Sequence, residues 1–218
     1  MRHLRKLLLW LALVGVGSSQ ALDFSDLAKE GEIRFLAQRP DPGAYWFESE
    51  VRLSRQSLQT GLVDVFTCHH ALDPNHKIEI TFNPQRVTRV EVAQAQGMAE
   101  ARTDGLRVVL SDVQRGAKAC INIESKALDA TGPGVWTLHA GPLMRRYFDG
   151  FLPMQAKLKV TWPAGLLRLA AVSPEAQPGV VVGRAPDQAS MDATFAGTLR
   201  VRWVLKMTEG QVASAQRP

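Results

Sequence analysis

Apolar and polar residues alternate with a period of two in several stretches of the chain. In residues 154–162, for example, Leu158 and Val160 alternate with Lys157 and Lys159. A period of two places alternate side chains on opposite faces of a β-strand, so each stretch buries one face and exposes the other. The same alternation is present in residues 45–54, 77–82, 106–111, 118–124 and 199–207. The pattern predicts half-buried antiparallel strands.

Short turn signals separate these stretches. Asp104-Gly105 is the strongest hairpin signal, because both residues tolerate the positive φ angles of a type I′ turn. Eight to ten short strands separated by such turns predict an all-β fold, namely a single antiparallel β-sandwich with one or two short helices. An immunoglobulin-like topology is one option that the sequence leaves open.

Four segments depart from the strand pattern. Residues 24–30 and 142–149 favour short helices, the second opening on a proline at a position where helices tolerate one. Residues 173–192 are rich in Pro, Gly and polar residues, so we expect a long connection with one edge strand. Residues 208–218 lack an apolar pattern and predict a mobile C-terminal tail.

The first 21 residues have the composition of a secretory signal peptide. Basic residues at positions 2, 5 and 6 precede an apolar run over 7–16, and small residues lead to a cleavage site after Ala21. The apolar run is too short to span a bilayer. We therefore predict a domain over 22–207, a periplasmic or secreted location and no transmembrane segment after cleavage.

The charge of the chain depends on that leader. Its removal would lower the formal net charge from +5 to +2, because residues 1–21 carry three of the Lys and Arg side chains and no acid. With this balance and no recognised motif, we do not expect a nucleic-acid partner. The composition also excludes collagen, a coiled coil and wholesale disorder.

The chain has two cysteines, Cys68 and Cys120. In an oxidising compartment, two cysteines predict one disulfide. Cys120 shares parity with Lys118 and Asn122, on the polar face of its strand. We therefore expect the bridge near a sheet end or on an outer face, whereas the immunoglobulin disulfide lies in the core.

Cys68, His69, His70 and His76 form the main concentration of metal-ligand side chains. Thiolate and imidazole ligands suit zinc or copper. Neighbouring strand residues point to opposite faces, so His69 and His70 reach one ion only where the strand ends. A metal-binding protein using these four residues is the alternative function. The competing interpretation is a disulfide followed by surface histidines, and no cofactor is predicted.

The segment 141–154 combines arginine and aromatic side chains between prolines. These residue types often anchor protein interfaces. We therefore predict a partner-binding site formed by Arg145, Arg146, Tyr147, Phe148 and Phe151. The competing interpretation is a lid that closes one end of the sandwich with its aromatic rings in the core.

Cations also line the polar faces of two predicted strands. Lys157 and Lys159 lie on one of them, and Arg200, Arg202 and Lys206 lie on the other. If the two strands were neighbours, these five side chains would form a basic patch that attracts an acidic partner. The competing interpretation is a solvated sheet face whose charges discourage edge pairing.

The sequence contains none of the local catalytic motifs that we sought, among them G-x-S-x-G, H-E-x-x-H and the P-loop. His139 has Asp129 and Asp149 as possible carboxylate partners, which is the minimal basis for an assembled hydrolase site. The sequence therefore favours an exported, non-enzymatic binding or accessory protein, with a protein partner in the cell envelope.

Overall fold

The computed structural model describes residues 28, 32–39, 41, 43–147 and 150–208. The predicted signal peptide and nearly all of the predicted C-terminal tail lie outside the described residues. Within them the chain is almost entirely β, with one four-residue helix, α1 (Ser57–Thr60). No helix in the described part of the chain has the length and apolar character needed to cross a membrane.

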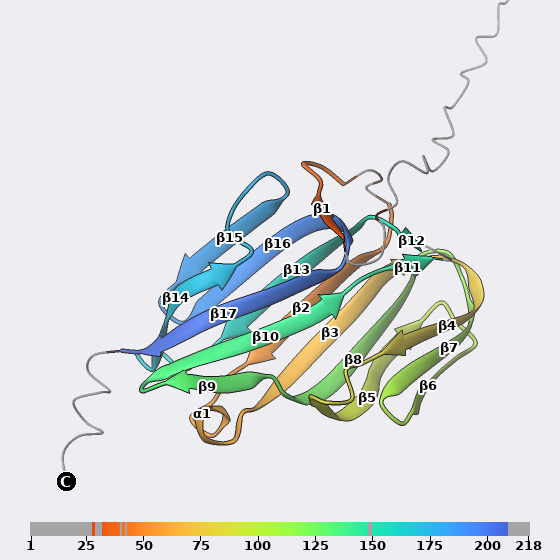
Figure 1. The fold of residues 1–218 in the computed structure, drawn as a ribbon. Helices are drawn as coiled ribbons and strands as arrows, with labels where there is room; N and C mark the ends of the chain where they lie inside the picture. The colour runs from red at the N-terminus through yellow and green to blue at the C-terminus, as the bar shows by residue number, and fades with distance from the viewer. Residues whose placement is uncertain (1–27, 29–31, 40, 42, 148–149, 209–218) are drawn as a thin grey trace, which may run out of the picture.

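Seventeen strands among the described residues form three larger sheets and one two-stranded sheet (Figure 1). The eight-stranded sheet contains β1 (Ile33–Phe35), β2 (Trp46–Arg52), β3 (Leu62–Leu72), β5 (Val87–Gln96), β8 (Ala117–Lys126), β13 (Met154–Thr161), β15 (Val180–Ala185) and β16 (Gln188–Gly197). The four-stranded sheet contains β9 (Leu128–Gly132), β10 (Val135–Leu143), β14 (Leu167–Ser173) and β17 (Leu199–Met207). The three-stranded sheet contains β4 (Asn75–Thr81), β6 (Glu100–Asp104) and β7 (Arg107–Val113), and β11 (Arg146–Tyr147) pairs with β12 (Gly150–Phe151).

These sheets form the predicted sandwich. The order of the eight-stranded sheet is β1-β16-β13-β2-β3-β8-β5, with β15 also paired to β16. The four-stranded sheet, in the order β14-β17-β10-β9, lies in front of it in Figure 1. Pairing is antiparallel throughout except between β2 and β13, which are parallel. A sheet of eight strands with a parallel pair differs from the immunoglobulin-like topology that the sequence left open.

The core lies between the eight-stranded sheet and the other two large sheets. Trp203 of β17, Leu110 of β7 and Phe195 of β16 are fully buried and belong to one apolar cluster. Each comes from the apolar parity of an alternating strand, as a period of two requires. The polar residues that alternate with them on the same strands lie on the two outer faces, where they are accessible to a binding partner.

Two local predictions were wrong. Residues 142–149 are not helical in their described part, because their backbone pairs with other strands: Leu143 lies opposite Leu199, and Arg146 opposite Phe151. Residues 173–192 contain the expected edge strand, β15, but they are not mainly a connection, because the first half of β16 also lies there. In the predicted helix at 24–30, only Ala28 is described, and it forms a β-bridge with Phe151.

The hairpin at Asp104-Gly105 is confirmed, but its turn is not the expected type I′, because Asp104 belongs to β6 and only Gly105 of the two residues has a positive φ. β6 and β7 pair along their length, and Asp104 lies opposite Arg107 across the turn. Gly105 has a φ of +60°, which glycine adopts without steric cost.

Candidate binding surface

The three predicted metal-binding histidines do not converge. His69 is buried and shares a hydrogen bond of 2.8 Å with the hydroxyl of Tyr45. His70, the next residue of β3, lies on the opposite face of the sheet. His76 is fully exposed on β4 in the three-stranded sheet, 3.3 Å from a carboxylate oxygen of Asp112. The prediction that His69, His70 and His76 form one metal site was therefore wrong, because the strand continues through His69 and His70.

The predicted disulfide is confirmed, and it joins two neighbouring strands. Cys68 of β3 and Cys120 of β8 lie directly opposite each other on the outer side of the eight-stranded sheet. Both residues are nevertheless buried, at 2% and 1% exposure. Their burial reflects the side chains that surround them on this face.

A polar cluster surrounds the disulfide. Nε2 of His70 lies 2.7 Å from Oε1 of Glu48, which is opposite Cys68 on β2. The imidazole stacks on the Trp46 ring, with centroids 3.8 Å apart and planes 3° from parallel. The ammonium of Lys157 lies 5.1 Å from the centroid of the same ring. His70 is thus held in one orientation by contacts on two sides.

The predicted partner-binding segment makes mainly internal contacts. Arg145 forms an ion pair with Asp73, donates to the carbonyl of Pro153 and lies over the Tyr45 ring. Phe151 is buried at 5% exposure, whereas Arg146 is exposed. The side chain of Tyr147 and all of Phe148 lie outside the described residues.

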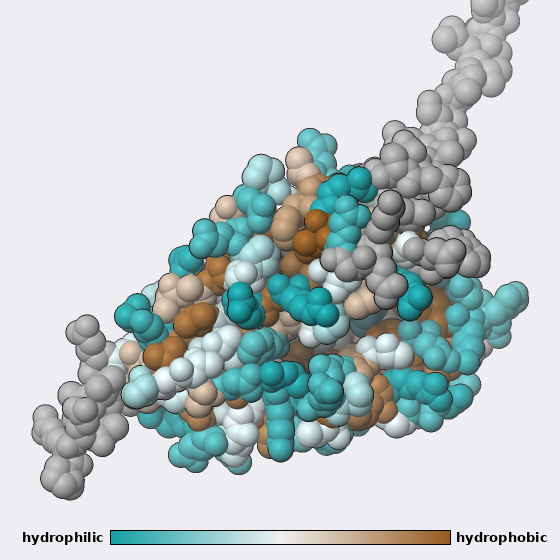
Figure 2. Space-filling view, viewed as in Figure 1, coloured by the Kyte–Doolittle hydropathy of each residue, from teal (hydrophilic) through white to brown (hydrophobic). Residues whose placement is uncertain are grey.

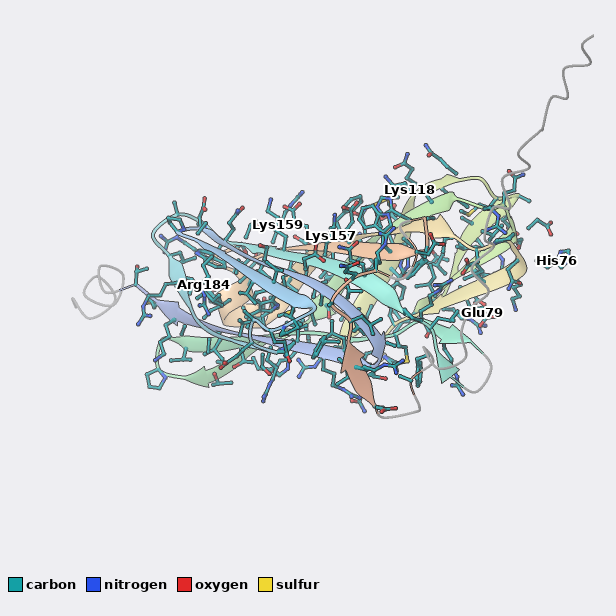
Figure 3. All side chains as sticks on the ribbon, turned by 90° about the horizontal axis from the view of Figure 1, so that it is seen from above. His76, Glu79, Lys118, Lys157, Lys159 and Arg184 are labelled. Atoms are coloured by element: carbon teal, nitrogen blue, oxygen red, sulfur yellow. A yellow bond between two sulfur atoms is a disulfide. The ribbon has the colours of Figure 1, made fainter. Side chains whose placement is uncertain are left out.

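The predicted five-residue basic patch does not form, because its two strands belong to different sheets. Lys157 and Lys159 are exposed on β13, whose neighbours are β2 and β16. Arg200, Arg202 and Lys206 are exposed on β17 in the four-stranded sheet. Figure 3 shows Lys157 and Lys159 together with Lys118 on the side of the eight-stranded sheet.

The β17 half of that patch gains a fourth cation from the neighbouring strand. Arg168 of β14 is exposed and lies directly opposite Lys206. We call Arg168, Arg200, Arg202 and Lys206 the cationic face. In the described part of the chain, none of the four forms an ion pair. Figure 2 shows hydrophilic side chains interspersed with apolar ones on this side of the molecule.

One acidic residue is present in the strands of the four-stranded sheet, and other basic groups already bind it. Asp129 of β9 accepts two hydrogen bonds from the Arg86 guanidinium, at 2.8 and 3.1 Å. These bonds lower the pKa of Asp129. Nε2 of His139 lies 3.1 Å from the same carboxylate. Asp129 therefore interacts with Arg86 and His139, and it does not neutralise the positive charge of the cationic face.

His139 belongs to the same electrostatic environment. Its position on β10 is directly opposite Arg202. Burial lowers the pKa of His139, the positive charges of Arg86 and Arg202 lower it further, and Asp129 opposes them. Burial disfavours a charge of either sign, whereas the positive charges of Arg86 and Arg202 favour an anion nearby.

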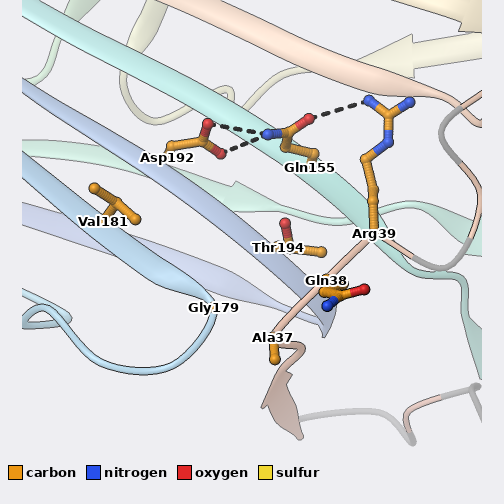
Figure 4. A pocket seen from close by; sticks show the side chains of 8 residues that line it. All are labelled: Ala37, Gln38, Arg39, Gln155, Gly179, Val181, Asp192 and Thr194. Atoms are coloured by element: carbon orange, nitrogen blue, oxygen red, sulfur yellow. Dashed lines mark hydrogen bonds between the residues drawn. The ribbon is translucent and has the colours of Figure 1, made fainter.

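A separate hollow lies at the edge of the eight-stranded sheet, with a volume of about 410 Å³ (Figure 4). Arg39 donates to Oε1 of Gln155 at 3.0 Å, and Nε2 of Gln155 donates to both oxygens of Asp192 at 2.7 and 3.0 Å. The two charges are thus linked through an amide, and the hollow presents no uncompensated charge comparable to the cationic face.

Arg168 and Arg86 are residues of this side of the molecule that the sequence did not single out. Arg168 lies between Leu167 and Leu169, so its parity predicts an exposed position, but only strand order shows that its neighbour is β17. Arg86 lies in the connection between β4 and β5 and reaches Asp129 over 43 positions of sequence. No local sequence pattern predicts the contact between Arg86 and Asp129.

No protein-family model and no curated protein matches the chain. Among solved structures, it is similar to an M1 zinc metallopeptidase from Deinococcus radiodurans, with 13% identity and a TM-score of 0.40 over 82% of this chain and 43% of that one. A mutant of that enzyme bound to a Tyr-Ser-Ala substrate gives 12% identity and the same TM-score and coverage. The chain therefore spans less than half the length of these structures.

Proposed function

We propose that this chain is an exported, non-enzymatic binding or accessory protein that docks an acidic region of another cell-envelope protein on its cationic face. The observation that carries the proposal is the direct opposition of Arg168 and Lys206, beside two further arginines and without an acidic partner among the described residues. Like charges directly opposite each other destabilise a sheet. Retaining them is expected where a binding partner supplies the opposite charge.

The residue types favour carboxylate groups on a protein as the partner chemistry. Three of the four cations are arginines, whose planar guanidinium groups bind carboxylates through two hydrogen bonds. Arginine is also enriched in protein interfaces, where lysine is depleted. The face lies on rigid strands, and neither described hollow is on it. A broad charged surface of this kind suits another protein surface better than a small molecule.

The hydrolase alternative has one element in place, namely the contact between His139 and Asp129. In acyl-transfer sites the histidine also contacts a nucleophile, which it deprotonates. The described side-chain partners of His139 contain no hydroxyl or thiol. The binding proposal is supported by four residues of this sheet, whereas the hydrolase alternative is supported by one pair.

The experiment measures binding of the folded chain to poly-L-glutamate, an acidic polypeptide probe. Replacing Arg200 and Arg202 by Gln is expected to weaken binding at least tenfold at low salt. Raising the salt should weaken wild-type binding, because surface charges are screened. The matched control replaces Lys118 and Lys159 by Gln, which removes the same charge from the opposite sheet and should leave affinity within twofold.

A second arm uses co-purification from a cell-envelope fraction. Proteins retained by the wild type and the Lys118/Lys159 control but lost from the Arg200/Arg202 variant would be the partners that the proposal predicts. The proposal is wrong if the two double variants bind the probe equally. It is also wrong if vesicles of anionic phospholipid bind the cationic face while poly-L-glutamate does not.

A further inference from the structure

We propose that the reduced chain binds a zinc ion through Cys68, Cys120, His70 and Glu48, and that formation of the disulfide releases it. This site is on the outer side of the eight-stranded sheet, away from the cationic face. The inference does not depend on the proposed docking function. It also differs from the metal site of Cys68, His69, His70 and His76 that the sequence predicted, since His69 and His76 take no part.

The ligand atoms are already gathered. One ligating atom each from Glu48, Cys68 and His70 lies within 4.8 Å of the other two. The Cys120 sulfur is bonded to that of Cys68, so reduction leaves a second thiol beside this group, which a side-chain rotation would bring to the same ion. Three neighbouring strands position these residues: Glu48 on β2 and Cys120 on β8 both lie opposite Cys68 on β3.

The donor set suits zinc. Two thiolates, an imidazole and a carboxylate are ligands that Zn²⁺ binds with tetrahedral geometry, at about 2.0–2.3 Å. Those bond lengths place neighbouring ligand atoms about 3.3–3.8 Å apart. The separations of up to 4.8 Å among the ligand atoms of Glu48, Cys68 and His70 need only side-chain rotations to reach that range. Zinc would replace the proton now shared between His70 and Glu48.

The surroundings preorganise the site. The Trp46 ring fixes the plane of the His70 imidazole, and both cysteines are almost fully buried. The Lys157 ammonium lies over the Trp46 ring and helps to hold that ring in place against the imidazole. A metal ligand held by its neighbours loses less freedom on binding, which raises affinity.

Disulfide formation and zinc binding compete for the same two sulfurs. When a disulfide oxidant RSSR reacts, the Cys68 and Cys120 thiolates give up two electrons and form the S–S bond. RSSR accepts those electrons and two protons to become two RSH, and Zn²⁺ loses two of its four ligands. A chain made in a reducing cytosol carries both thiols before it reaches an oxidising compartment. Zinc can therefore bind while both thiols are reduced, and oxidation to the disulfide then prevents its binding.

The test compares the reduced and oxidised chain, each freed of metal. The reduced chain is expected to bind one equivalent of Zn²⁺ in competition with a chromophoric chelator, and the oxidised chain to bind none. With Co²⁺ in place of Zn²⁺, the reduced chain should show thiolate-to-metal charge-transfer absorption. Adding oxidised glutathione should release the zinc to the chelator as the two thiols disappear.

Variants assign the ligands. His70→Ala and Glu48→Gln should each weaken zinc binding to the reduced chain at least tenfold, whereas His76→Ala and His139→Ala should not change it. Far-UV circular dichroism monitors folding throughout. If reduction unfolds the chain, zinc should restore the fold of the wild type but not of His70→Ala. Equal zinc binding by the oxidised chain, no binding by the reduced chain, or binding unaffected by both ligand variants would overturn the proposal.

Discussion

The hydroxyl of Tyr45 and Nδ1 of His69 lie 2.8 Å apart in the interior of the protein. Burial lowers the pKa of His69 to about 4, and the neighbouring His70 contributes further. Burial likewise raises the pKa of Tyr45. Nε2 of His69 has no hydrogen-bond partner among the described residues. The folded protein therefore holds this histidine neutral.

Acid should destabilise the protein through His69. Its folded-state pKa of about 4 lies below the unfolded value of 6.5, so the unfolded chain binds the proton first. The contribution is complete above pH 6.5 and is lost as the pH falls toward 4, by at most about 3 kcal/mol. Urea unfolding across this range measures it. His69→Asn should have a flatter pH dependence, and a variant with the wild-type dependence would refute the assignment. The exposed His76→Ala serves as the control.

Arg145 is expected to stabilise the protein rather than to contact a partner. It joins Asp73, Tyr45 and the carbonyl of Pro153, which come from three separate segments. Arg145→Ala should lower the free energy of unfolding by about 1–3 kcal/mol, because it removes a charged hydrogen-bonding group that is mostly buried. Chemical denaturation checks this. The exposed neighbour gives the control: Arg146→Ala should change stability by less than about 0.5 kcal/mol.

The disulfide should contribute strongly to stability. It links residues that are 52 positions apart, so in the chain-entropy model it stabilises the fold by about 4 kcal/mol. Replacing both cysteines by Ala should reduce the free energy of unfolding by up to that amount. The measurement is made with a chelator present, so that bound metal does not contribute. If the double Ala variant has the same unfolding midpoint as the wild type, the disulfide does not stabilise the fold by restricting the unfolded chain.

Gly197 is expected to tolerate no side chain. Its φ is +101°, and a Cβ at this position would overlap the carbonyl oxygen of Glu32. Gly197→Ala should therefore destabilise the protein by at least about 2 kcal/mol. Gly105→Ala is the matched control, since Gly105 also has a positive φ but no neighbour within 4 Å of the added atom. Its cost should be about 1 kcal/mol. Equal thermal stabilities would argue against the overlap.

The like charges of the cationic face should lower the free energy of unfolding while they strengthen binding to an acidic partner. Arg168→Glu places opposite charges where Arg168 and Lys206 now face each other. We expect the free energy of unfolding to rise by about 0.2–1 kcal/mol, while affinity for poly-L-glutamate falls. Arg184→Glu, which makes the same charge change on β15, should leave affinity unchanged. If Arg168→Glu binds poly-L-glutamate as tightly as the wild type, Arg168 is not part of the binding surface.

The strands with strong alternation were predictable because their pattern is local. Residues 154–162 and 199–207 contain β13 and β17, and the apolar parity of each lies in the core. β16 was missed because its buried positions include three small alanines, and its flanks are rich in Pro and Gly. The helix expected at 142–149 failed because pairing with other strands outweighs local propensity.

The candidate sites were only partly predictable. Parity placed Lys157 and Arg202 on exposed faces, but a period of two does not specify the neighbouring strand. The metal prediction grouped histidines by sequence proximity. The structure instead brings Glu48 to His70 from another strand, and this carboxylate had no feature that marked it in advance.

The sequence by itself determined the β-class, the disulfide and the face on which each strong strand exposes its polar residues. These follow from local alternation and from having only two cysteines. The tertiary structure alone decided which strands are neighbours. That order separated Lys157 from Arg200, placed Arg168 opposite Lys206 and gathered Glu48 and His70 around Cys68. Strand order depends on long-range packing and hydrogen bonding, which a period of two in one strand does not encode.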